Sequence, residues 1–384
     1  MEHGRVTVGE VALQWGRIGC IGFGGPPAHI SLLRELCVTR RGWLSEEQFE
    51  DGVAATNLLP GPASTQLAIL CAWRVAGVPG ALVGGVAFIV PGLVLIVALA
   101  SVFLAGSPPE WILGAGAGAG AAVPAVAAHA GISLMPASWA RALGGQRGRW
   151  VAYVLLGGLA SSAVGPWLVL VLLGCGLVEL VWCRGAPRSL PAVHLPALTL
   201  LAAAVGAGGL GALAWTAFKV GALSYGGGFV IIPLMQADAL DQHWMTNAQF
   251  LNAVALGQVT PGPVVHTVAV VGYAAAGVGG ALLAAAVAFG PSFSFILLGT
   301  DRFDRLSSHA GVRAFLAGAG PAAIGAIIGS CIPLAGSLTE AWQSGLLALA
   351  ALALFALRRG VVLVLLAAGS VGVVLALAGA PLPG

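Results

Sequence analysis

The stretch Asn57-Leu-Leu-Pro-Gly-Pro-Ala-Ser-Thr-Gln66 decides how this chain folds. Pro60 and Pro62 lack the backbone N–H group that a helix interior needs, and Gly61 loosens the chain between them. A helix must therefore end here, and a new helix can begin with Pro62 at its first position. The N–H groups of that first turn have no partner within the helix, and their partial positive charge suits an anion. The polar side chains around this break belong to Asn57, Ser64, Thr65 and Gln66.

The same pattern recurs in the second half of the chain, at a spacing of 200–202 residues. Trp43 with Gln48-Phe49 matches Trp244 with Gln249-Phe250, and Pro60-Gly61-Pro62 matches Pro261-Gly262-Pro263. Chance does not produce such ordered matches in register, so the sequence predicts two homologous halves, residues 1–190 and 191–384. The second polar break consists of Gln258, Thr260, Pro261, Gly262, Pro263, His266 and Thr267.

The composition places these breaks inside a membrane. Of the 384 residues, 58% are apolar and 8% are charged, whereas roughly 25% are charged in an ordinary soluble domain. The mean hydropathy is +0.96. So few charges exclude a cytosolic enzyme, a nucleic-acid binder and a disordered chain. Because the apolar runs are continuous rather than alternating, we expect an all-α, polytopic helical membrane protein and not a barrel.

Apolar runs long enough to span a bilayer, about 20 residues each, occur at 81–104, 111–135, 196–223, 281–298, 315–334, 341–357 and 361–378. The run 151–181 is interrupted by Gly165-Pro166, which favours a tight pair of short helices over one long tilted helix. Residues 11–75 and 224–276 are broken by Gly, Pro and polar clusters, which predicts broken or re-entrant helices.

Arginine placement gives the topology. If 151–181 is a helical pair, four basic loops fall on one side, which the positive-inside rule makes cytoplasmic. The turn at residues 77–80 is then cytoplasmic and the turn at 277–280 exterior, so the two halves are expected to be inverted, as in transporters. Strict inversion places the N-terminus outside, but the polar N-terminal residues leave that side open. The four loops carry Arg141, Arg147 and Arg149; Arg184 and Arg188; Arg302, Arg305 and Arg313; and Arg358 and Arg359.

A second pair of turns is built from Gly24-Gly25-Pro26-Pro27 and Gly226-Gly227-Gly228. Each precedes an apolar stretch that can begin a short helix, at 28–38 and 229–235. Four helix starts meeting near the membrane midplane would form a cage of N–H donors suited to a tetrahedral oxyanion. The alternative is that these glycines and prolines serve only as kinks and close helix contacts.

Charged and titratable residues complete the candidate site. Arg17 and Lys219 occupy the same repeat position inside apolar helices, where a cation is costly and usually functional. We expect both to project toward the centre and supply positive potential; the alternative is snorkelling to the membrane surface. His29 follows the first glycine turn and could carry a proton. No metal-ligand spacing, nucleophile elbow or phosphate loop is present, so neither a cofactor nor a metal is expected.

At these residues the sequence resembles the chromate ion transporter family, of the long two-domain type. The resemblance rests on residues 23–30, on Trp43 with Gln48-Phe49, on residues 57–66 and on the echo from Tyr225 to Pro263. It implies a multi-pass protein of the bacterial inner membrane that exports chromate and confers resistance, with sulfate as the related anion. It also implies homologous halves of opposite orientation. One departure is His266 at the position of Thr65, so the two half-sites differ chemically.

We therefore expect a secondary transporter of a tetrahedral divalent oxyanion, chromate before sulfate, with the lipid bilayer as surroundings and no nucleic-acid partner. A carrier that takes up or exchanges sulfate or another oxyanion is the alternative within this class. A membrane-embedded enzyme is a remote alternative, and a homodimer stays open.

Overall fold

The computed structural model describes residues 6–59, 61–142, 145–163, 167–184, 209–224, 229–299 and 310–383. Within these ranges every regular element is a helix, and four helices are long and apolar enough to cross a membrane. The predicted class, an all-α polytopic membrane protein, is confirmed. The helices of the first half are α1 Val8–Ile21, α2 Pro26–Arg34 with a π-helical turn Glu35–Arg40, α3 Glu46–Leu58, α4 Ala63–Phe103, α5 Glu110–Arg141, α6 Gln146–Ala163 and α7 Leu168–Arg184.

The second half follows the same order. Its helices are α9 Leu210–Leu223, α10 Ile231–Asp241, α11 Asn247–Val259, α12 Thr267–Gly299 after a 3₁₀ turn Val264–His266, α14 Ala310–Gly336, α15 Ala341–Ala351 with a π-helical turn Leu352–Ala356, and α16 Val361–Leu377. The predicted span 196–223 lies outside the described residues up to 208.

Matching local signals start matching helices in the two halves. Before α3, the Ser45 hydroxyl accepts from Gln48 N–H (3.1 Å), and the Gln48 side chain accepts from Ser45 N–H (2.9 Å). Thr246 and Gln249 form the same reciprocal pair before α11. Because each box satisfies two otherwise unpaired N–H groups, both helices begin at the same repeat position.

Each half contains a re-entrant helical hairpin. Gly52 of α3 faces Leu67 and Leu70 of α4, and the Arg74 guanidinium donates to the Gln48 carbonyl, so α3 and the beginning of α4 run antiparallel. In the second half, Gly257 of α11 packs against Thr267 at the start of α12. We call the turns between these helices the first tip (Leu59, Gly61 and Pro62) and the second tip (Thr260–Pro263). The prediction of broken, re-entrant helices is confirmed.

Within α4 and within α12 the chain reverses direction once more, at a break inside the helix. The backbone leaves the helical region at Ala76 and Gly77 in α4, and at Ala276 and Gly277 in α12, with glycine φ values of 64° and 61°. Glycine reaches this left-handed region without steric cost. Beyond the break Gly84 packs against Ala72, although twelve residues of straight helix would separate them by about 18 Å.

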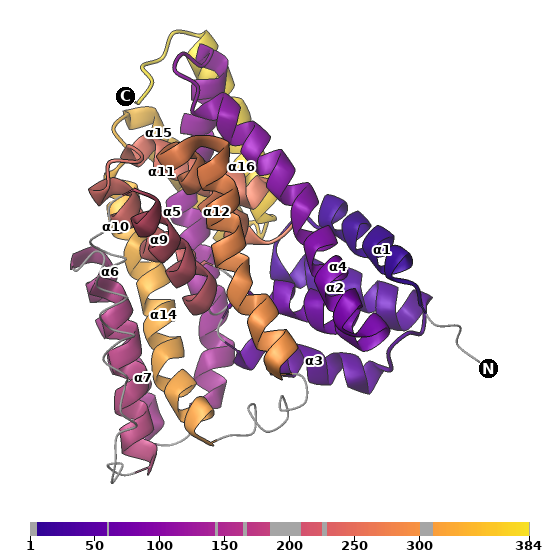
Figure 1. The fold of residues 1–384 in the computed structure, drawn as a ribbon. Helices are drawn as coiled ribbons and strands as arrows, with labels where there is room; N and C mark the ends of the chain where they lie inside the picture. The colour runs from indigo at the N-terminus through magenta and orange to yellow at the C-terminus, as the bar shows by residue number, and fades with distance from the viewer. Residues whose placement is uncertain are drawn as a thin grey trace.

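We call the parts of the two helices that follow these breaks, residues 78–103 of α4 and 278–299 of α12, their outgoing parts. The outgoing parts run in opposite directions (Figure 1). Residues 104–109 join α4 to α5, and α5 and α14 are antiparallel. Gly131 of α5 faces Ile327 of α14, whereas Arg141 shares a cavity with Arg313 near the start of α14. Helix α1 runs beside the outgoing part of α4 in the same direction, with Val11 at Gly84 and Gly19 at Phe88. Helix α1 therefore begins at the same end of the fold as the Gly77 break. The sequence had not determined this side for the N-terminus.

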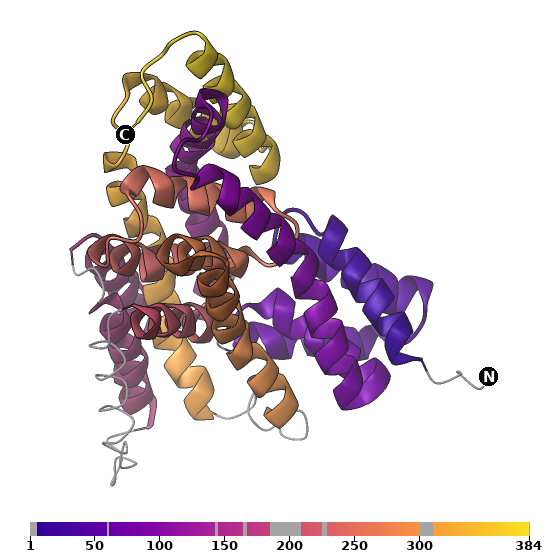
Figure 2. The same cartoon turned by 45° about the horizontal axis from the view of Figure 1, so that its top comes forward.

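The two halves exchange their last helices. The α6–α7 hairpin packs on α14 of the second half, and the α15–α16 hairpin packs on α5 of the first half. In the turned view of Figure 2 the C-terminal helices gather at the top, away from α1–α3, whereas the last part of α4 reaches up toward them. Glycines permit the contacts: Gly157 lies on the Ala322 carbonyl, and Gly118 on the Ala368 carbonyl. The prediction of two short helices within 151–181 is confirmed; Gly165 and Pro166 lie outside the described residues.

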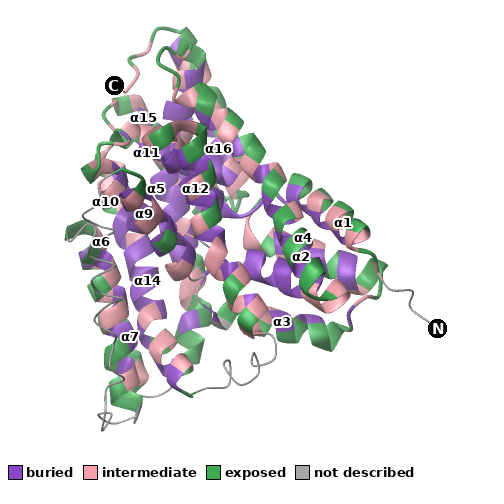
Figure 3. Cartoon of the chain, in the orientation of Figure 1, coloured by how far each residue is buried: buried purple, intermediate pink, exposed green. Residues whose placement is uncertain are grey.

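Figure 3 shows exposed residues along the outward faces of the helices, and many of the large side chains exposed there are apolar. Such a surface is stable only against lipid tails, because large exposed apolar areas are rare on soluble monomers. Large exposed apolar side chains include Leu13, Val86, Val94, Leu155, Leu159, Leu282, Leu363, Val374 and Leu377.

Candidate functional site

The two tips cross over between the halves. The Gly262 N–H of the second tip donates to the carbonyl of Gly22, at the end of α1 (2.9 Å). Gly61 of the first tip lies against the carbonyl of Gly221 in α9. Gly61 has a φ of 117° and Gly262 a φ of 95°, in the positive region that favours glycine over other residues. Each tip therefore rests on the first helix of the opposite half. Pro60 lies outside the described residues.

A cavity of about 330 Å³ opens at the first tip. We call it the tip cavity. It is bordered by the beginning of α2 at Pro26 and Pro27 and by the beginning of α4 at Ala63. In α4 the N–H groups of Thr65 and Gln66 bond to the Pro62 carbonyl, which leaves those of the first two residues without an intrahelical partner. Two helix N-termini thus border one cavity. The other lining residues are Thr56, Asn57, Leu59, Gly61, Ala130, Ser133, Leu134, Ala137, Arg141, Phe229, Ala323, Ile324 and Ile327.

Arg141 is the charged residue in this lining. It ends a stripe on α5 that begins at Ala130 and continues through Ser133 and Ala137, at spacings that place these residues on one helix face. From the sequence, Arg141 indicated only the topology and was not predicted to be a site residue. The sequence signal for Arg141 is its place on the same face of α5 as the small residues Ala130, Ser133 and Ala137.

The four predicted helix starts do lie together. Phe229, just before α10, lines the tip cavity, and Val264 at the start of the α12 segment lies against Gly25 before α2. Gly24 and Gly25 have φ values of 99° and 73°, so they form the expected turn. Gly226 and Gly227 lie outside the described residues. That an anion binds among these starts stays a prediction.

The polar side chains at the start of α4 lie behind the cavity rather than in it. Ser64, Thr65 and Gln66 are buried and are not part of the lining. The Gln66 amide folds back over Gly61, whereas the Thr65 hydroxyl has no hydrogen-bond partner in the described part of the chain. Asn57, in contrast, is exposed and lines the cavity.

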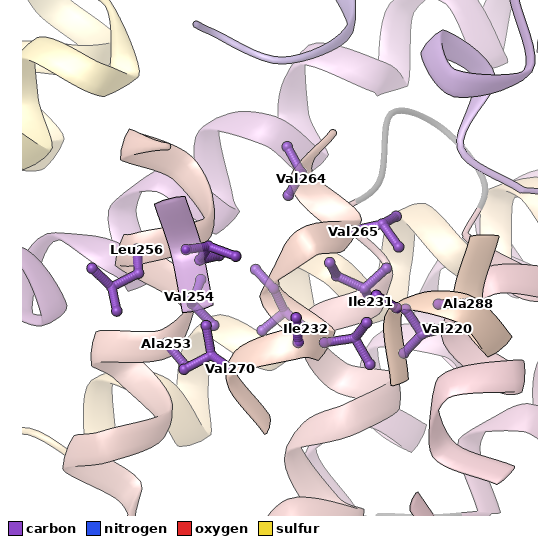
Figure 4. Close-up of a cluster of buried hydrophobic side chains, with 14 of the residues drawn as sticks. Val220, Ile231, Ile232, Ala253, Val254, Leu256, Val264, Val265, Val270 and Ala288 are labelled. Atoms are coloured by element: carbon purple, nitrogen blue, oxygen red, sulfur yellow. The ribbon is translucent and has the colours of Figure 1, made fainter. Parts of the chain in front are cut away.

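The second tip is closed by apolar packing (Figure 4). Val264 and Val265 lie among side chains of α9, α10, α11 and α12, including Val220, Ile231 and Val254. The second tip is therefore packed against apolar side chains, whereas the first tip borders the tip cavity.

The polar groups of the second tip are largely occupied. The Thr260 hydroxyl donates to the Leu256 carbonyl (2.9 Å) and the Thr267 hydroxyl to the Val264 carbonyl (2.8 Å). A hydroxyl has one proton, so in this structure the Thr267 proton is already used, and donation from Thr267 to an anion stays a prediction. Gln258 is buried, and its side-chain nitrogen has no partner among the described residues.

The two histidines of the predicted site are fully buried. His29 Nε2 lies 2.9 Å from the Gly22 carbonyl, which also accepts from Gly262, so His29 fixes the crossing of the second tip. His266 lies edge-on to Phe289 and over Gly92, and the Ile89 carbonyl is nearby. Neither nitrogen of the His266 ring forms a hydrogen bond with the described residues. Both rings are part of the packing behind the tips and not of the cavity lining.

The cations require a correction. Lys219 is buried, with 3% of its side chain exposed, and forms an ion pair with Asp238 of α10, which also accepts from the Thr216 hydroxyl (2.6 Å). The positive charge expected for the anion is therefore already neutralised. The sequence did not lead us to predict Asp238 as the partner of Lys219, although a carboxylate inside an apolar helix indicates a paired or functional group.

Arg17 does not reach the centre either. It is exposed, on the side of α1 opposite the buried face formed by Val11, Trp15 and Ile18. The prediction that Arg17 and Lys219 project to the same region is wrong, because α10 covers the Lys219 side of α9 while the Arg17 side of α1 is left uncovered.

Comparison with known proteins agrees with this architecture. The family model described as chromate transporter matches residues 9–180 and 211–373, one segment in each half. The chromate transport protein of Cupriavidus metallidurans is 31% identical over 359 residues, which cover 91% of this chain and 88% of the relative. The chromate transport protein of Pseudomonas aeruginosa is 30% identical over 381 residues, covering 93% and 89%. No solved structure matches. Since the family model covers both halves and these relatives align along most of the chain, the protein belongs to the chromate transporter family, whose members are membrane transporters and not enzymes.

Proposed function

We propose that this protein is a secondary transporter that moves a tetrahedral divalent oxyanion, chromate first of all, out of a bacterial cell across the inner membrane. The tip cavity carries the proposal: two helix N-termini, at Pro26 and Ala63, and the Arg141 side chain border one space of about 330 Å³. A water molecule occupies roughly 30 Å³ of liquid, so this space suits an oxyanion that keeps part of its water shell.

The chemistry of the lining favours a dianion. The N-terminus of α4 offers N–H donors with partial positive charge, and an arginine offers a charge-assisted fork of donors. Helix α2 begins with Pro26 and Pro27, which have no N–H group, so it contributes the positive end of its dipole and not donors at these two positions. The Asn57 amide adds a neutral donor at the rim. Removing a full water shell costs several kcal/mol per ion, which a partly hydrated site avoids. The relatives named as chromate transport proteins make chromate the first substrate to test.

Alternating access follows from the crossing tips. The outgoing parts of α4 and α12 run in opposite directions, and each tip rests on the first helix of the other half. These features support an inverted repeat, with halves at 1–190 and 191–384. In such proteins the halves rock about a site formed by broken helices. The closed second tip and the open tip cavity then correspond to one of two end states.

The direction of transport follows from charge. Arg141 lines the tip cavity and shares the neighbouring cavity with Arg313, and both arginines belong to the basic loops of the sequence. The positive-inside rule makes the side of these loops cytoplasmic. Moving a dianion outward from a negative-inside cell is downhill by about 2.3 kcal/mol per charge per 100 mV. Export therefore needs no additional driving ion, and it would lower cellular chromate and confer resistance.

The test uses inside-out membrane vesicles that contain the protein, with vesicles lacking it as control. We expect uptake of labelled chromate that rises with a positive-inside potential, falls when an ionophore collapses it, and is reduced by excess sulfate. Uptake of sulfate without chromate would identify the protein as a carrier of the other oxyanion. Chromate accumulation only in right-side-out vesicles would reverse the proposed direction.

A further inference from the structure

A second cavity, of about 410 Å³, lies beside the tip cavity at the ends of four helices. It is formed where α5 and α7 end and where α6 and α14 begin. We call it the outer cavity. Arg141 lines both cavities, so the two spaces meet at this residue.

The carboxylate of the outer cavity is already neutralised. Glu179 lines the space, yet only 2% of its side chain is exposed. Arg149 donates to both of its oxygens, at 2.8 and 2.9 Å, and the Tyr153 hydroxyl donates at 2.9 Å. A carboxylate with three such donors neither needs a further cation nor repels an anion as a free one would.

Two arginines of the outer cavity have no carboxylate partner among the described residues. Arg141 ends α5 and Arg313 lies in the first turn of α14; both are exposed and both line the space. Neither forms an ion pair with any carboxylate of the described ranges. With Arg149 and Glu179 cancelling, the lining therefore keeps two positive charges, which match the charge of a divalent oxyanion.

Resting on the proposed function, we propose that the outer cavity is a capture site for the divalent oxyanion. Arg141 and Arg313 bind the anion from the cytoplasm, and Arg141 then holds it as it passes into the tip cavity. The planar guanidinium suits this step because it presents paired donors to two oxygens of the anion at once. A mouth lined by one sign of charge also raises the local concentration of the opposite ion, an effect that salt weakens.

The experiment measures chromate transport from each side in oriented vesicles. In inside-out vesicles, Arg313→Gln should raise the half-saturating chromate concentration about tenfold, equivalent to about 1.4 kcal/mol, with little change in the maximal rate. Arg313→Lys should recover part of the affinity, because it keeps the charge and loses the fork. From the opposite face, the half-saturating concentration of Arg313→Gln should equal that of the unaltered protein.

The matched control is Arg359→Gln, which removes an exposed arginine that lines neither cavity. It should leave both values unchanged. Equal losses in Arg359→Gln and Arg313→Gln, or an Arg313→Gln effect of the same size from both faces, would overturn the capture site and leave a general surface-charge effect.

If the unaltered protein moves neither chromate nor sulfate, the proposed function itself fails. If the unaltered protein transports the anion and Arg313→Gln has the same half-saturating concentration, only the capture site is disproved. Unfolding temperatures of all variants in detergent separate these outcomes from misfolding.

Discussion

At the scale of single residues, the buried charges show what a membrane protein does with a cation it cannot hydrate. Lys219 pairs with Asp238, and the Thr216 hydroxyl supplies a further hydrogen bond to the carboxylate. Trp215 also lies near the ammonium, whose nitrogen is 5.8 Å from the ring centroid. This arrangement ties α9 to α10, and it leaves Arg141 and Arg313 to supply positive charge for an anion.

A double-mutant cycle distinguishes this structural role from a transport role. Lys219→Ala or Asp238→Ala alone leaves a buried unpaired charge, so each should destabilise the protein by about 3–5 kcal/mol. The double variant should be closer to the unaltered protein in unfolding temperature, and it should retain chromate transport. A double variant that is stable but inactive would return Lys219 to the anion site that the sequence predicted.

At the scale of elements, glycine decides where helices approach one another. Gly92 in α4 has no side chain, and the Pro261 carbonyl of the second tip and the His266 ring occupy the space beside it. A methyl group there would overlap the carbonyl oxygen. The contact places the second tip against the outgoing part of α4, so Gly92 is one of the positions at which the halves meet.

Gly92→Ala should therefore lower the unfolding temperature and impair transport, because overpacking typically costs about 1–3 kcal/mol. Gly290→Ala in α12 is the matched control, since no atom lies within 4 Å of the added methyl group. That variant should be neutral or slightly stabilised, as alanine favours helix over glycine by about 1 kcal/mol. Thermal unfolding in detergent and vesicle uptake provide both readouts. Equal behaviour of the two variants would contradict the close contact at Gly92.

At the scale of the whole molecule, the halves interlock. The α6–α7 hairpin of the first half is held by α14, and the α15–α16 hairpin of the second half is held by α5. Neither half has all its packing partners within itself. We therefore expect that residues 1–190 expressed alone do not fold, although the sequence divides naturally near that point.

Membrane orientation gives the sharpest test at this scale. Val78 and Val278 occupy matching, exposed positions just beyond the breaks in α4 and α12. In a cysteine-free background, Val78→Cys should react with a membrane-impermeant thiol reagent only from the cytoplasmic side, and Val278→Cys only from the outside. Each variant serves as the control for the other. Labelling of both from the same side would remove the inverted arrangement and, with it, the proposed rocking of the halves.

The sequence by itself determined the helical membrane class, the family and the position of the breaks. These features are local or periodic: long apolar runs, prolines without N–H groups, glycines at 61, 77, 262 and 277, and two matching capping boxes. Each acts through backbone chemistry within a few residues, so a single sequence can reveal it. The convergence of the four helix starts was predictable for the same reason, since two repeats with matching breaks bring matching ends together.

Only the tertiary structure decided which side chains face the cavities. Whether Arg17 points outward, whether Lys219 meets a carboxylate, and whether Arg141 stands between two cavities depend on which helix covers which face. Those neighbours come from distant parts of the chain: α10 on α9, and α14 beside α5. The sequence already made the half-sites chemically different, with His266 at the position of Thr65. It did not show that apolar packing covers the second tip while the first tip borders a cavity, because small differences in side-chain volume decide whether a space between helices is filled.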